Sequence, residues 1–403
     1  MSLGYKHKPG GLRILVLGYI VRGPMGGMTW HHLQYVLGLR QLGHDVFFLE
    51  DSGDTEYSCY DPKRNVTDAD PTFGLAYIRD VFKRVDMADR WAYYDHHTGN
   101  WKGPISGNVK AIIASADLLL NLSCSNPIRL WLEDVPVRVL IDTDPVFTQI
   151  RNLTDNDRNS LCRKHNVFFT FGENYGKENC TIPVDGFPWK PTRQPVVMQE
   201  WPLTKGPGNG NFSTVMKWES YPGKTYNGQY FGMKSESFTP FIDLPSQTKQ
   251  TLELSMSDHP EVQKELHKKG WKISNSLQLS SNPWAYQKFI QSSKGEFSIA
   301  KHGYVQANTG WFSERSTAYL ASGRPVICQD TGFGETIKCG EGLVAFKTVD
   351  EAVAGLEKVN KSYEKHCKKA RDLVEEYFNS KKVLDNLLNE AIKTHGSLSH
   401  RMK

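Results

Sequence analysis

The opening of the chain alternates between apolar strand-like runs and an apolar stretch with helical spacing. Residues 13–18 form a short apolar run, and a glycine-rich turn follows. Residues 30–42 then carry apolar side chains at helical spacing until Gly43 ends the pattern, and residues 45–49 read as a second buried strand. Two strands joined through a helix predict a β-α-β unit, and hence a parallel sheet covered by helices.

The same alternation continues along a chain of 403 residues, which is long enough for two domains of about 150 to 200 residues each. Apolar runs that end near Asn121, Asp142 and Gly172 predict further strands of the first domain. A segment rich in Pro, Gly, Trp and Asn predicts a linker within 185–222. A second set of strands is predicted near residues 212–217, 252–256, 296–300, 325–328 and 342–346, followed by helix over 349–393 with an interruption near Asn379.

Composition narrows the function classes without selecting one. The formal net charge of +5 suits anionic ligands, either nucleotide diphosphates or a nucleic acid. The seven cysteines form no C-x-x-C pair, which argues against a disulfide framework or a zinc site. No apolar signal region precedes the first strand and no run approaches the length of a membrane span, so we expect a cytoplasmic protein without an integral membrane segment.

Two glycine-containing turns carry the first chemical signals. The stretch G-P-M-G-G-M-T-W-H-H stands between the first strand and the first helix, where the amides of Gly26 and Gly27 could approach a phosphate. The alternative is a tight turn that needs glycine for its backbone conformation. In the second half, Ser313 is a plausible N-cap and Gly323 a plausible helix end. The first turn of the helix between these two residues has hydroxyls, backbone amides and a guanidinium that could bind an anion. The alternative is an ordinary capped helix without a ligand.

These two segments resemble the group 1 nucleotide-sugar-dependent glycosyltransferases. The stretch G-G-M-T-W-H-H-L-Q-Y-V-L-G-L-R-Q-L-G-H-D-V is similar to their opening helix. The stretch Y-L-A-S-G-R-P-V-I-C-Q-D-T-G-F is similar to their donor-site helix and the strand after it, usually written E-A-x-A-x-G-x-P-V-I. The order and spacing of the similarity cover nearly the whole chain.

The resemblance implies a GT-B fold, in which two Rossmann-like, doubly wound α/β domains face each other across a cleft. It implies an acceptor-side domain at residues 1–200, a nucleotide-sugar-binding domain at 201–375, and a C-terminal helix at 376–403 that packs back on the first domain. The implied activity is transfer of a sugar, most plausibly a hexose, from a nucleotide-diphosphate donor to an acceptor. Neither a metal nor another cofactor is required, because basic side chains neutralise the leaving nucleotide.

The resemblance also assigns donor-binding residues. Gly26 and Gly27 match the loop near the donor phosphate, and the helix carrying Arg315, Ser316 and Thr317 matches the helix that receives the diphosphate. A basic pair corresponds to Lys217 with either Lys224 or Lys234, and Lys301 and His302 follow a strand where they would line the sugar site.

One departure separates this sequence from the family pattern. Ala318 stands where the family carries a glutamate that contacts the donor ribose, and the second glutamate of the E-x7-E pattern would fall on Gly310. Glu314 lies one turn before Ala318 on the same helix face and is a candidate substitute. Both retaining and inverting transfer stay open.

Four residues are candidate bases for the acceptor hydroxyl: His31 or His32 at the start of the first helix, and Asp142 and Asp144 after an apolar strand. The alternative role of each histidine is that of a hydrogen-bonded helix residue, and the alternative role of each aspartate is that of a helix or turn cap. Aromatic residues over 91–97 and Trp101 could stack on an acceptor ring or pack within the domain. A small molecule or glycan is the expected acceptor. Modified DNA is a rival acceptor, and a catalytically silent sugar-nucleotide or glycan-binding protein is a rival function.

Overall fold

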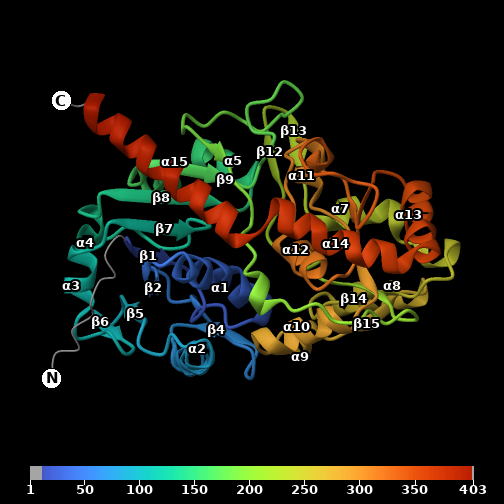
Figure 1. Cartoon of the computed structure of the whole chain (residues 1–403), viewed down its shortest axis with the longest axis horizontal. Coiled ribbons are helices and arrows are strands. Elements are labelled where there is room, and N and C mark those ends of the chain that lie inside the picture. Colours follow the sequence, from blue (N-terminus) through green and yellow to red (C-terminus); the bar gives the residue numbers. More distant parts are fainter. Residues whose placement is uncertain (1–10, 402–403) are drawn as a thin grey trace. The chain divides into compact units, whose positions relative to one another are not determined.

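The computed structural model describes residues 11–401, which form two compact units (Figure 1). Among the described residues, the first unit comprises 11–143, the segment Asp155–Phe169 and helix α15 (Ser380–Arg401). The second unit comprises Asp144–Thr154 and Thr170–Asn379. No helix among the described residues is both long enough and apolar enough to cross a membrane.

The first unit is built on a sheet with the strand order β9-β8-β7-β1-β2-β5-β6. From β5 through β2, β1 and β7 to β8 the neighbouring strands run parallel, and β6 is antiparallel to β5. The strands are β1 (Arg13–Leu17), β2 (Asp45–Asp51), β5 (Trp91–Asp95), β6 (Asn100–Lys102), β7 (Leu118–Leu122), β8 (Val137–Asp142) and β9 (Val167–Thr170). A separate antiparallel pair consists of β3 (Cys59–Asp61) and β4 (Val66–Asp68).

Helix α1 (Gly26–Gln41) is buried on nearly all sides, because twelve of its sixteen residues are shielded from solvent. Helix α15 packs against it at Gly38, where a Cβ atom would lie only 2.5 Å from a methyl carbon of Leu384. The C-terminal helix therefore belongs to the N-terminal unit, as the family resemblance predicted. The other helices of this unit are α2 (Thr72–Arg84), α3 (Val109–Ala114), α4 (Leu130–Glu133) and α6 (Asn156–Arg163).

The second unit contains an all-parallel sheet of six strands in the order β15-β14-β11-β16-β17-β18. Numbered along the chain, this order is 3-2-1-4-5-6, that of a dinucleotide-binding fold. The strands are β11 (Phe212–Val215), β14 (Leu252–Ser255), β15 (Lys272–Ser274), β16 (Gly295–Ser298), β17 (Val326–Gln329) and β18 (Leu343–Phe346). Two smaller strands, β12 (Lys224–Tyr226) and β13 (Gln229–Phe231), form a hairpin, and β10 is Lys190–Pro191.

Helices of the second unit pack against its sheet and against the β12–β13 hairpin. The helices of this unit are α5 (Phe147–Thr154), α7 (Lys234–Phe238), α8 (Pro260–Lys268), α9 (Ser276–Leu279), α10 (Pro283–Ser292), α11 (His302–Gln306), α12 (Glu314–Ala321), α13 (Val349–Lys361) and α14 (Tyr363–Tyr377). Single 3-10 turns occur at Met198–Glu200, Thr239–Phe241, Leu244–Gln247 and Phe333–Glu335. The predicted interruption near Asn379 is confirmed, since α14 ends at Tyr377 and α15 begins at Ser380.

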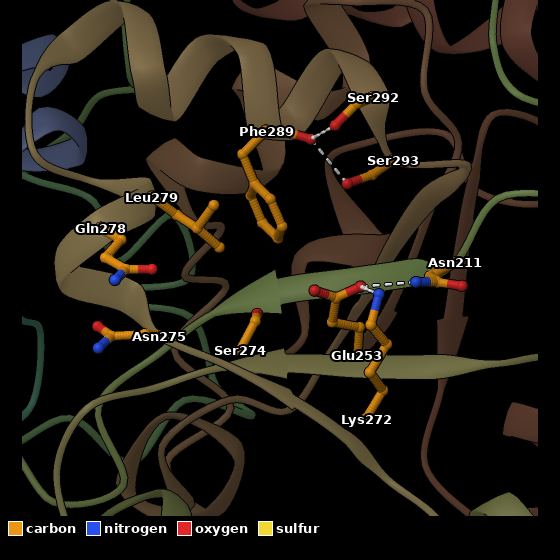
Figure 2. A pocket seen from close by; sticks show the side chains of 10 residues that line it. All are labelled: Asn211, Glu253, Lys272, Ser274, Asn275, Gln278, Leu279, Phe289, Ser292 and Ser293. Carbon is orange, nitrogen blue, oxygen red and sulfur yellow. Dashed lines mark hydrogen bonds and ion pairs between the residues drawn. The ribbon is translucent and has the colours of Figure 1, made fainter.

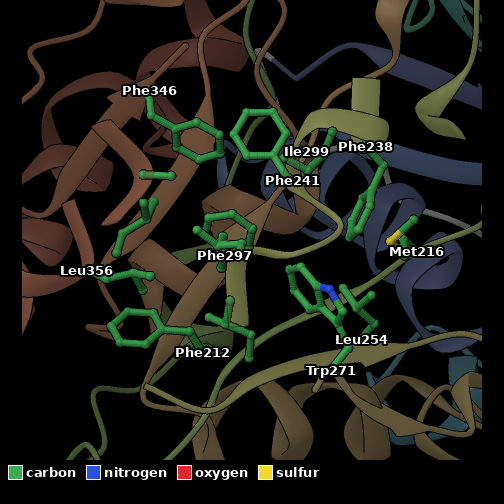
Figure 3. Packing of buried hydrophobic residues seen from close by; sticks show 14 of the residues in the cluster. Phe212, Met216, Phe238, Phe241, Leu254, Trp271, Phe297, Ile299, Phe346 and Leu356 are labelled. Carbon is green, nitrogen blue, oxygen red and sulfur yellow. The ribbon is translucent and has the colours of Figure 1, made fainter. Parts of the chain in front are cut away.

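The two faces of the second sheet differ in chemistry. One face carries the apolar core, in which Phe297 stacks on Phe346 with ring centroids 5.2 Å apart and Trp271 packs against Phe297 (Figure 3). The aligned residues of the opposite face are polar: Ser213 pairs in register with both Glu253 and Glu296. A buried parallel sheet usually presents apolar residues on both faces. The polar residues on this face therefore indicate a role in addition to core packing, such as ligand binding.

Candidate functional site

The second sheet reverses its strand order between β11 and β16. Strands β14 and β15 lie beyond β11 on one side, and β17 and β18 lie beyond β16 on the other. In open parallel sheets, ligands bind outside the carboxyl ends of the strands at such a switch point. The predicted donor-binding residues of the second half surround it: Lys217 follows β11, Lys301 follows β16, and Arg315 lies in the first turn of α12.

Helix α12 begins at this switch point with an N-cap, as predicted. The Ser313 hydroxyl accepts a hydrogen bond from the backbone N–H of Arg315 at 3.2 Å, and Gly323 ends the helix region with a positive φ of 70°. Ser316 is almost fully buried and lines a narrow pocket between the start of α12 and the ends of β16 and β17. The Thr317 hydroxyl instead donates to the Glu314 carbonyl at 2.7 Å, so it is engaged within the helix.

Arg315 is held by a buried carboxylate beneath it. Its Nε atom donates to Glu296 Oε1 at 2.6 Å, and its Nη1 atom donates to the carbonyl oxygen of Val215 at 3.0 Å. Glu296 is completely buried, and within residues 11–401 its second oxygen has no hydrogen-bond partner. The ion pair fixes the start of α12 to the last residue of β11, and one edge of the guanidinium is thereby occupied.

Lys234 is a cation of this site that has no counter-ion among residues 11–401, and unlike Lys217 it is shielded from most of the solvent. It is the first residue of α7, it is partly exposed, and no ion pair of Lys234 occurs within the described chain. Burial and the positive charges of Arg315 and Lys301 lower the pKa of its ammonium to about 7, against the opposing influence of Glu296 and Glu314. A bound anion would restore that pKa, so the position is suited to a phosphate.

Lys301 forms the centre of a second polar group. Its Nζ atom donates to Asp144 Oδ1 at 2.8 Å and lies 2.9 Å from the Tyr221 hydroxyl. Asp144 also accepts from Tyr221, from the Tyr304 hydroxyl at 2.5 Å and from Arg151 Nη2 at 3.1 Å. Burial would raise the pKa of Asp144, but Lys301 and Arg151 hold it below its usual value. A carboxylate with four donors is suited to positioning Lys301 rather than to accepting a proton.

Aromatic rings enclose the Lys301 ammonium. Its Nζ atom lies 4.5 Å from the centroid of Tyr221 and 5.2 Å from those of Phe147 and Tyr304. The side chain keeps 13% of its surface exposed. Ring faces attract a cation that is otherwise poorly solvated, which fixes the direction of the side chain.

His302 begins α11 directly after Lys301. Its Nδ1 atom accepts a hydrogen bond from the backbone N–H of Gly232 at 3.1 Å. A neutral ring that accepts at Nδ1 carries its proton on Nε2, and that nitrogen can then donate to a ligand oxygen. Lys217, the remaining predicted donor residue after a strand, is exposed in the loop that follows β11.

The structure gives a physical reason for the departure at Ala318. Ala318 is buried within α12, at 4% exposure, where a longer acidic side chain would have to enter the protein interior. Gly310 has a φ of 71°, and a Cβ atom there would lie 2.9 Å from the Asn174 side chain. Glu314 is exposed at the first position of the helix, where it acts on the pKa of Lys234. Its proposed contact with a ribose stays a prediction.

The predicted residues of the first unit lie on helix α1 and at the end of strand β8. Gly26 and Gly27 start α1, and His31 is buried in the second turn of that helix, in edge-to-face contact with His32 and Tyr35. His32 bonds through its two nitrogens to the Met28 carbonyl at 2.7 Å and the Tyr19 amide at 3.2 Å. Burial, followed by the neighbouring His31, lowers the pKa of His32 well below its usual value. His32 is thus a neutral structural residue, which favours His31 of the two histidines.

The two carboxylates predicted as candidate bases, Asp142 and Asp144, belong to different units. Asp142 is the last residue of β8 in the first unit and is buried, whereas Asp144 belongs to the second unit. In the first unit, the loop after β1 is fixed by another carboxylate: Glu50 accepts from the backbone amides of Val21 and Arg22, each at 2.7 Å. Burial raises the pKa of Glu50 despite the nearby Arg22.

An aromatic surface, defined here as Tyr94, Trp101 and Trp131, lies in the first unit. Its rings have centroid separations of 5.1 Å for Tyr94 and Trp101 and 4.9 Å for Tyr94 and Trp131. Tyr94 stands near the carboxyl end of β5, and Trp131 is 37% exposed in α4. The predicted aromatic residues thus divide: Trp91 and Tyr93 are buried, and Tyr94 and Trp101 join Trp131.

Sequence reasoning missed four residues of this site: Glu296, Tyr221, Tyr304 and Arg151. Only Glu296 had a readable signal, because an acid in the middle of the apolar stretch G-E-F-S-I-A is expensive to bury without a partner. The other three are ordinary loop and helix residues until the fold brings them to Asp144.

Known protein structures share this fold over nearly the full chain. An alpha-glucosyltransferase in complex with UDP and a DNA containing a HMU base aligns with a TM-score of 0.60 at 11% identity, covering 95% of this chain and 100% of that one. The Anabaena protein HepE in complex with UDP and glucose aligns at 0.54 with 10% identity, 95% and 100% coverage. AviGT4, a glycosyltransferase involved in avilamycin A biosynthesis, aligns at 0.52 with 11% identity, 96% and 98% coverage.

These likenesses concern the fold. No protein-family model matches the sequence, and no curated protein matches it either. The likeness to these solved structures confirms the GT-B fold class predicted from the two sequence segments.

Proposed function

We propose that this protein is a glycosyltransferase that moves a hexosyl group from a nucleotide-diphosphate donor to an acceptor hydroxyl. The observation that carries the proposal is Lys234, a cation without a counter-ion at the switch point of the second sheet, whose pKa is lowered to about 7. The fold shared with proteins solved in complex with UDP adds support. A diphosphate supplies the charge that this position lacks.

The proposed reaction breaks the bond between the sugar C1 and the diphosphate oxygen and forms a bond between C1 and the acceptor oxygen. Negative charge develops on the departing diphosphate, where Lys234 and the N-terminal amides of α12 would stabilise it. The acceptor proton passes to a base. His31 and Asp142 are our candidates, because Asp144 already accepts from four donors.

The donor part of the proposal is tested by UDP affinity in a matched pair of lysine variants. Lys234→Met should raise the dissociation constant by about tenfold or more, the effect of losing one hydrogen bond to a charged group. Lys224→Met tests the other candidate of the predicted basic pair and should leave the affinity unchanged, because Lys224 is exposed in the β12–β13 hairpin. Wild-type affinity in folded Lys234→Met would remove Lys234 from the donor site. Donor hydrolysis without acceptor would separate an enzyme from a silent nucleotide-sugar-binding protein.

We further propose that basic side chains replace a metal in this reaction, and that the protein works in the cytoplasm with its seven cysteines as thiols. Turnover that is unchanged by EDTA is the expected outcome. Loss of turnover with EDTA and recovery with Mg²⁺ or Mn²⁺ would overturn the metal-independent reading.

For the acceptor we propose a small molecule or glycan. The cations near the aromatic surface are already paired: Arg129 with Asp51 at 2.9 Å and Asp54 at 2.7 Å, and Lys102 with Asp95 at 3.0 Å. Paired cations contribute little to phosphate binding, whereas exposed rings suit the apolar face of a sugar or other ring.

Modified DNA is the second candidate acceptor, because the solved alpha-glucosyltransferase complexes of the same fold contain DNA. Binding of duplex DNA measured against salt distinguishes the two. A nucleic-acid acceptor predicts a steep fall in affinity with rising salt, since each neutralised phosphate releases a counter-ion. A neutral acceptor predicts transfer rates that salt leaves nearly unchanged.

A further inference from the structure

The polar face of the second sheet contains a pocket of about 310 Å³ beneath α9 and α10 (Figure 2). It lies outside the donor site described above, toward the β14–β15 side of the sheet. Its floor comes from the sheet and from the residue before β11, and its walls from the two helices. The lining residues are Asn211, Glu253, Lys272, Ser274, Asn275, Gln278, Leu279, Phe289, Ser292 and Ser293.

The charges of this pocket cancel. Glu253 Oε2 accepts a hydrogen bond from Asn211 Nδ2 at 2.6 Å and lies 3.0 Å from Lys272 Nζ. Among the lining residues Glu253 and Lys272 are the only charged ones, so an ionic ligand would find no net opposite charge. The other oxygen of Glu253 points into the pocket in Figure 2, where it can accept from a ligand donor.

The remaining walls combine apolar and uncharged polar groups. The Phe289 ring and the Leu279 side chain point into the space from the helix side (Figure 2). Asn275 and Gln278 add exposed amides, whereas the Ser292 and Ser293 hydroxyls donate to the Phe289 carbonyl and can still accept from a ligand. Amides that donate and accept and hydroxyls that accept, beside one aromatic ring, match a ligand with many hydroxyl groups and an apolar C–H face.

We propose that this pocket binds a single neutral sugar ring, independently of the donor nucleotide. Its volume equals the space of about ten water molecules at roughly 30 Å³ each, which holds one pyranose with a few waters. The Glu253 carboxylate accepts from sugar hydroxyls while Asn211 and Lys272 keep it ionised. Phe289 packs on the C–H face of the ring.

The test is ligand-observed NMR of methyl glycosides of glucose, galactose and mannose with the full-length protein saturated with UDP. We expect saturation transfer from the protein to at least one glycoside. Phe289→Ala should weaken that binding by about three- to tenfold, and Glu253→Gln by about tenfold or more. Lys288→Ala, at an exposed neighbouring position of α10, should leave the affinity unchanged.

Gln278→Ala adds a variant whose folding is not in question, because Gln278 is exposed on α9, and it should weaken binding about threefold. Thermal unfolding of every variant confirms the folded state. Absence of transfer to all three glycosides, or equal transfer in the pocket variants and in Lys288→Ala, would overturn the proposal. Displacement of the signal by uridine or adenosine at concentrations that leave UDP bound would identify a nucleoside pocket instead.

Discussion

The two parallel sheets of this protein place their polar residues differently. In the first unit, β1 (R-I-L-V-L) and β7 (L-L-L-N-L) are apolar runs, and buried polar residues such as Glu50 and Asp142 stand at the carboxyl ends of the strands. In the second unit, β14 (L-E-L-S) and β16 (G-E-F-S) alternate, so that Glu253 and Glu296 lie within the sheet, and β11 (F-S-T-V) between them has two polar residues. In the first sheet the buried polar side chains named here stand at the carboxyl ends of the strands. In the second sheet, buried acids also lie within the strands, on the polar face of the sheet.

Glu296 is the clearest example of an acid within the second sheet. Of the substitutions considered, Glu296→Ala should have the largest effect on the free energy of unfolding. The change leaves the Arg315 guanidinium buried without its carboxylate, and we expect a loss of about 3 to 5 kcal/mol in the free energy of unfolding measured with urea. The double variant Glu296→Leu with Arg315→Met removes both charges and should restore most of that stability while weakening UDP binding. A single-variant loss below about 1 kcal/mol would mean that this face tolerates an unpaired charge.

The first unit should instead be most sensitive to packing. Gly38→Ala places a Cβ atom 2.5 Å from Leu384 and must shift the Leu384 side chain or α15 itself, so we expect a loss of about 1 to 3 kcal/mol in the free energy of unfolding. Gly107→Ala in the same unit is the control, because nothing lies within 4 Å of its Cβ position. Equal stability of the two variants would show that α15 is not tightly seated.

Lys234 predicts a pH dependence of nucleotide binding. Its ammonium loses the proton near pH 7 in the free protein, whereas a bound diphosphate would retain it. Binding therefore takes up a proton above pH 7, and the UDP dissociation constant should rise by up to about tenfold per pH unit, as calorimetry between pH 7 and 9 can measure. Lys234→Arg stays protonated and should remove this slope. A slope that persists in that variant would assign the proton to another group.

The smallest effect is expected at Glu253, the other acid of the polar face. Its partner Lys272 is half exposed and can be hydrated when the carboxylate is removed. Glu253→Ala should therefore cost only about 1 kcal/mol in urea unfolding, close to the value of one hydrogen bond. A loss as large as that of Glu296→Ala would erase the distinction between the two acids.

The sequence was sufficient for the fold because local patterns determine it. Glycine turns, capped helices and apolar runs predicted the two parallel sheets and the break near Asn379, and two motifs predicted the GT-B class. The site was less accessible. Lys301 and Asp144 were both candidates, but their contact depends on a separation of 157 residues along the chain that no spacing encodes. The sequence does not predict that Tyr221 and Tyr304 contact Asp144. One tyrosine lies in a loop and the other in a short helix, where no periodic pattern indicates which residues they contact.

The acids of β14 and β16 carry a signal that the apolar pattern alone does not. An acid within a buried strand of a parallel sheet requires a specific partner. Arg315 is that partner for Glu296, and Lys272 with Asn211 for Glu253. The sequence does not predict the partner of each acid, because strand register and helix position determine which side chains come into contact.

The short segment Asp144–Thr154 has a consequence for how this protein can be dissected or recombined. The chain passes between units after Thr143, Thr154, Phe169 and Asn379, so four junctions rather than one separate the two units. A gene cut at any single point would leave one unit without α5 or α15, and exchange of one half with a relative would transplant an incomplete core. A functional chimera would have to exchange every segment of a unit at once, three for the first unit or two for the second, so a single crossover between related genes cannot exchange either unit intact.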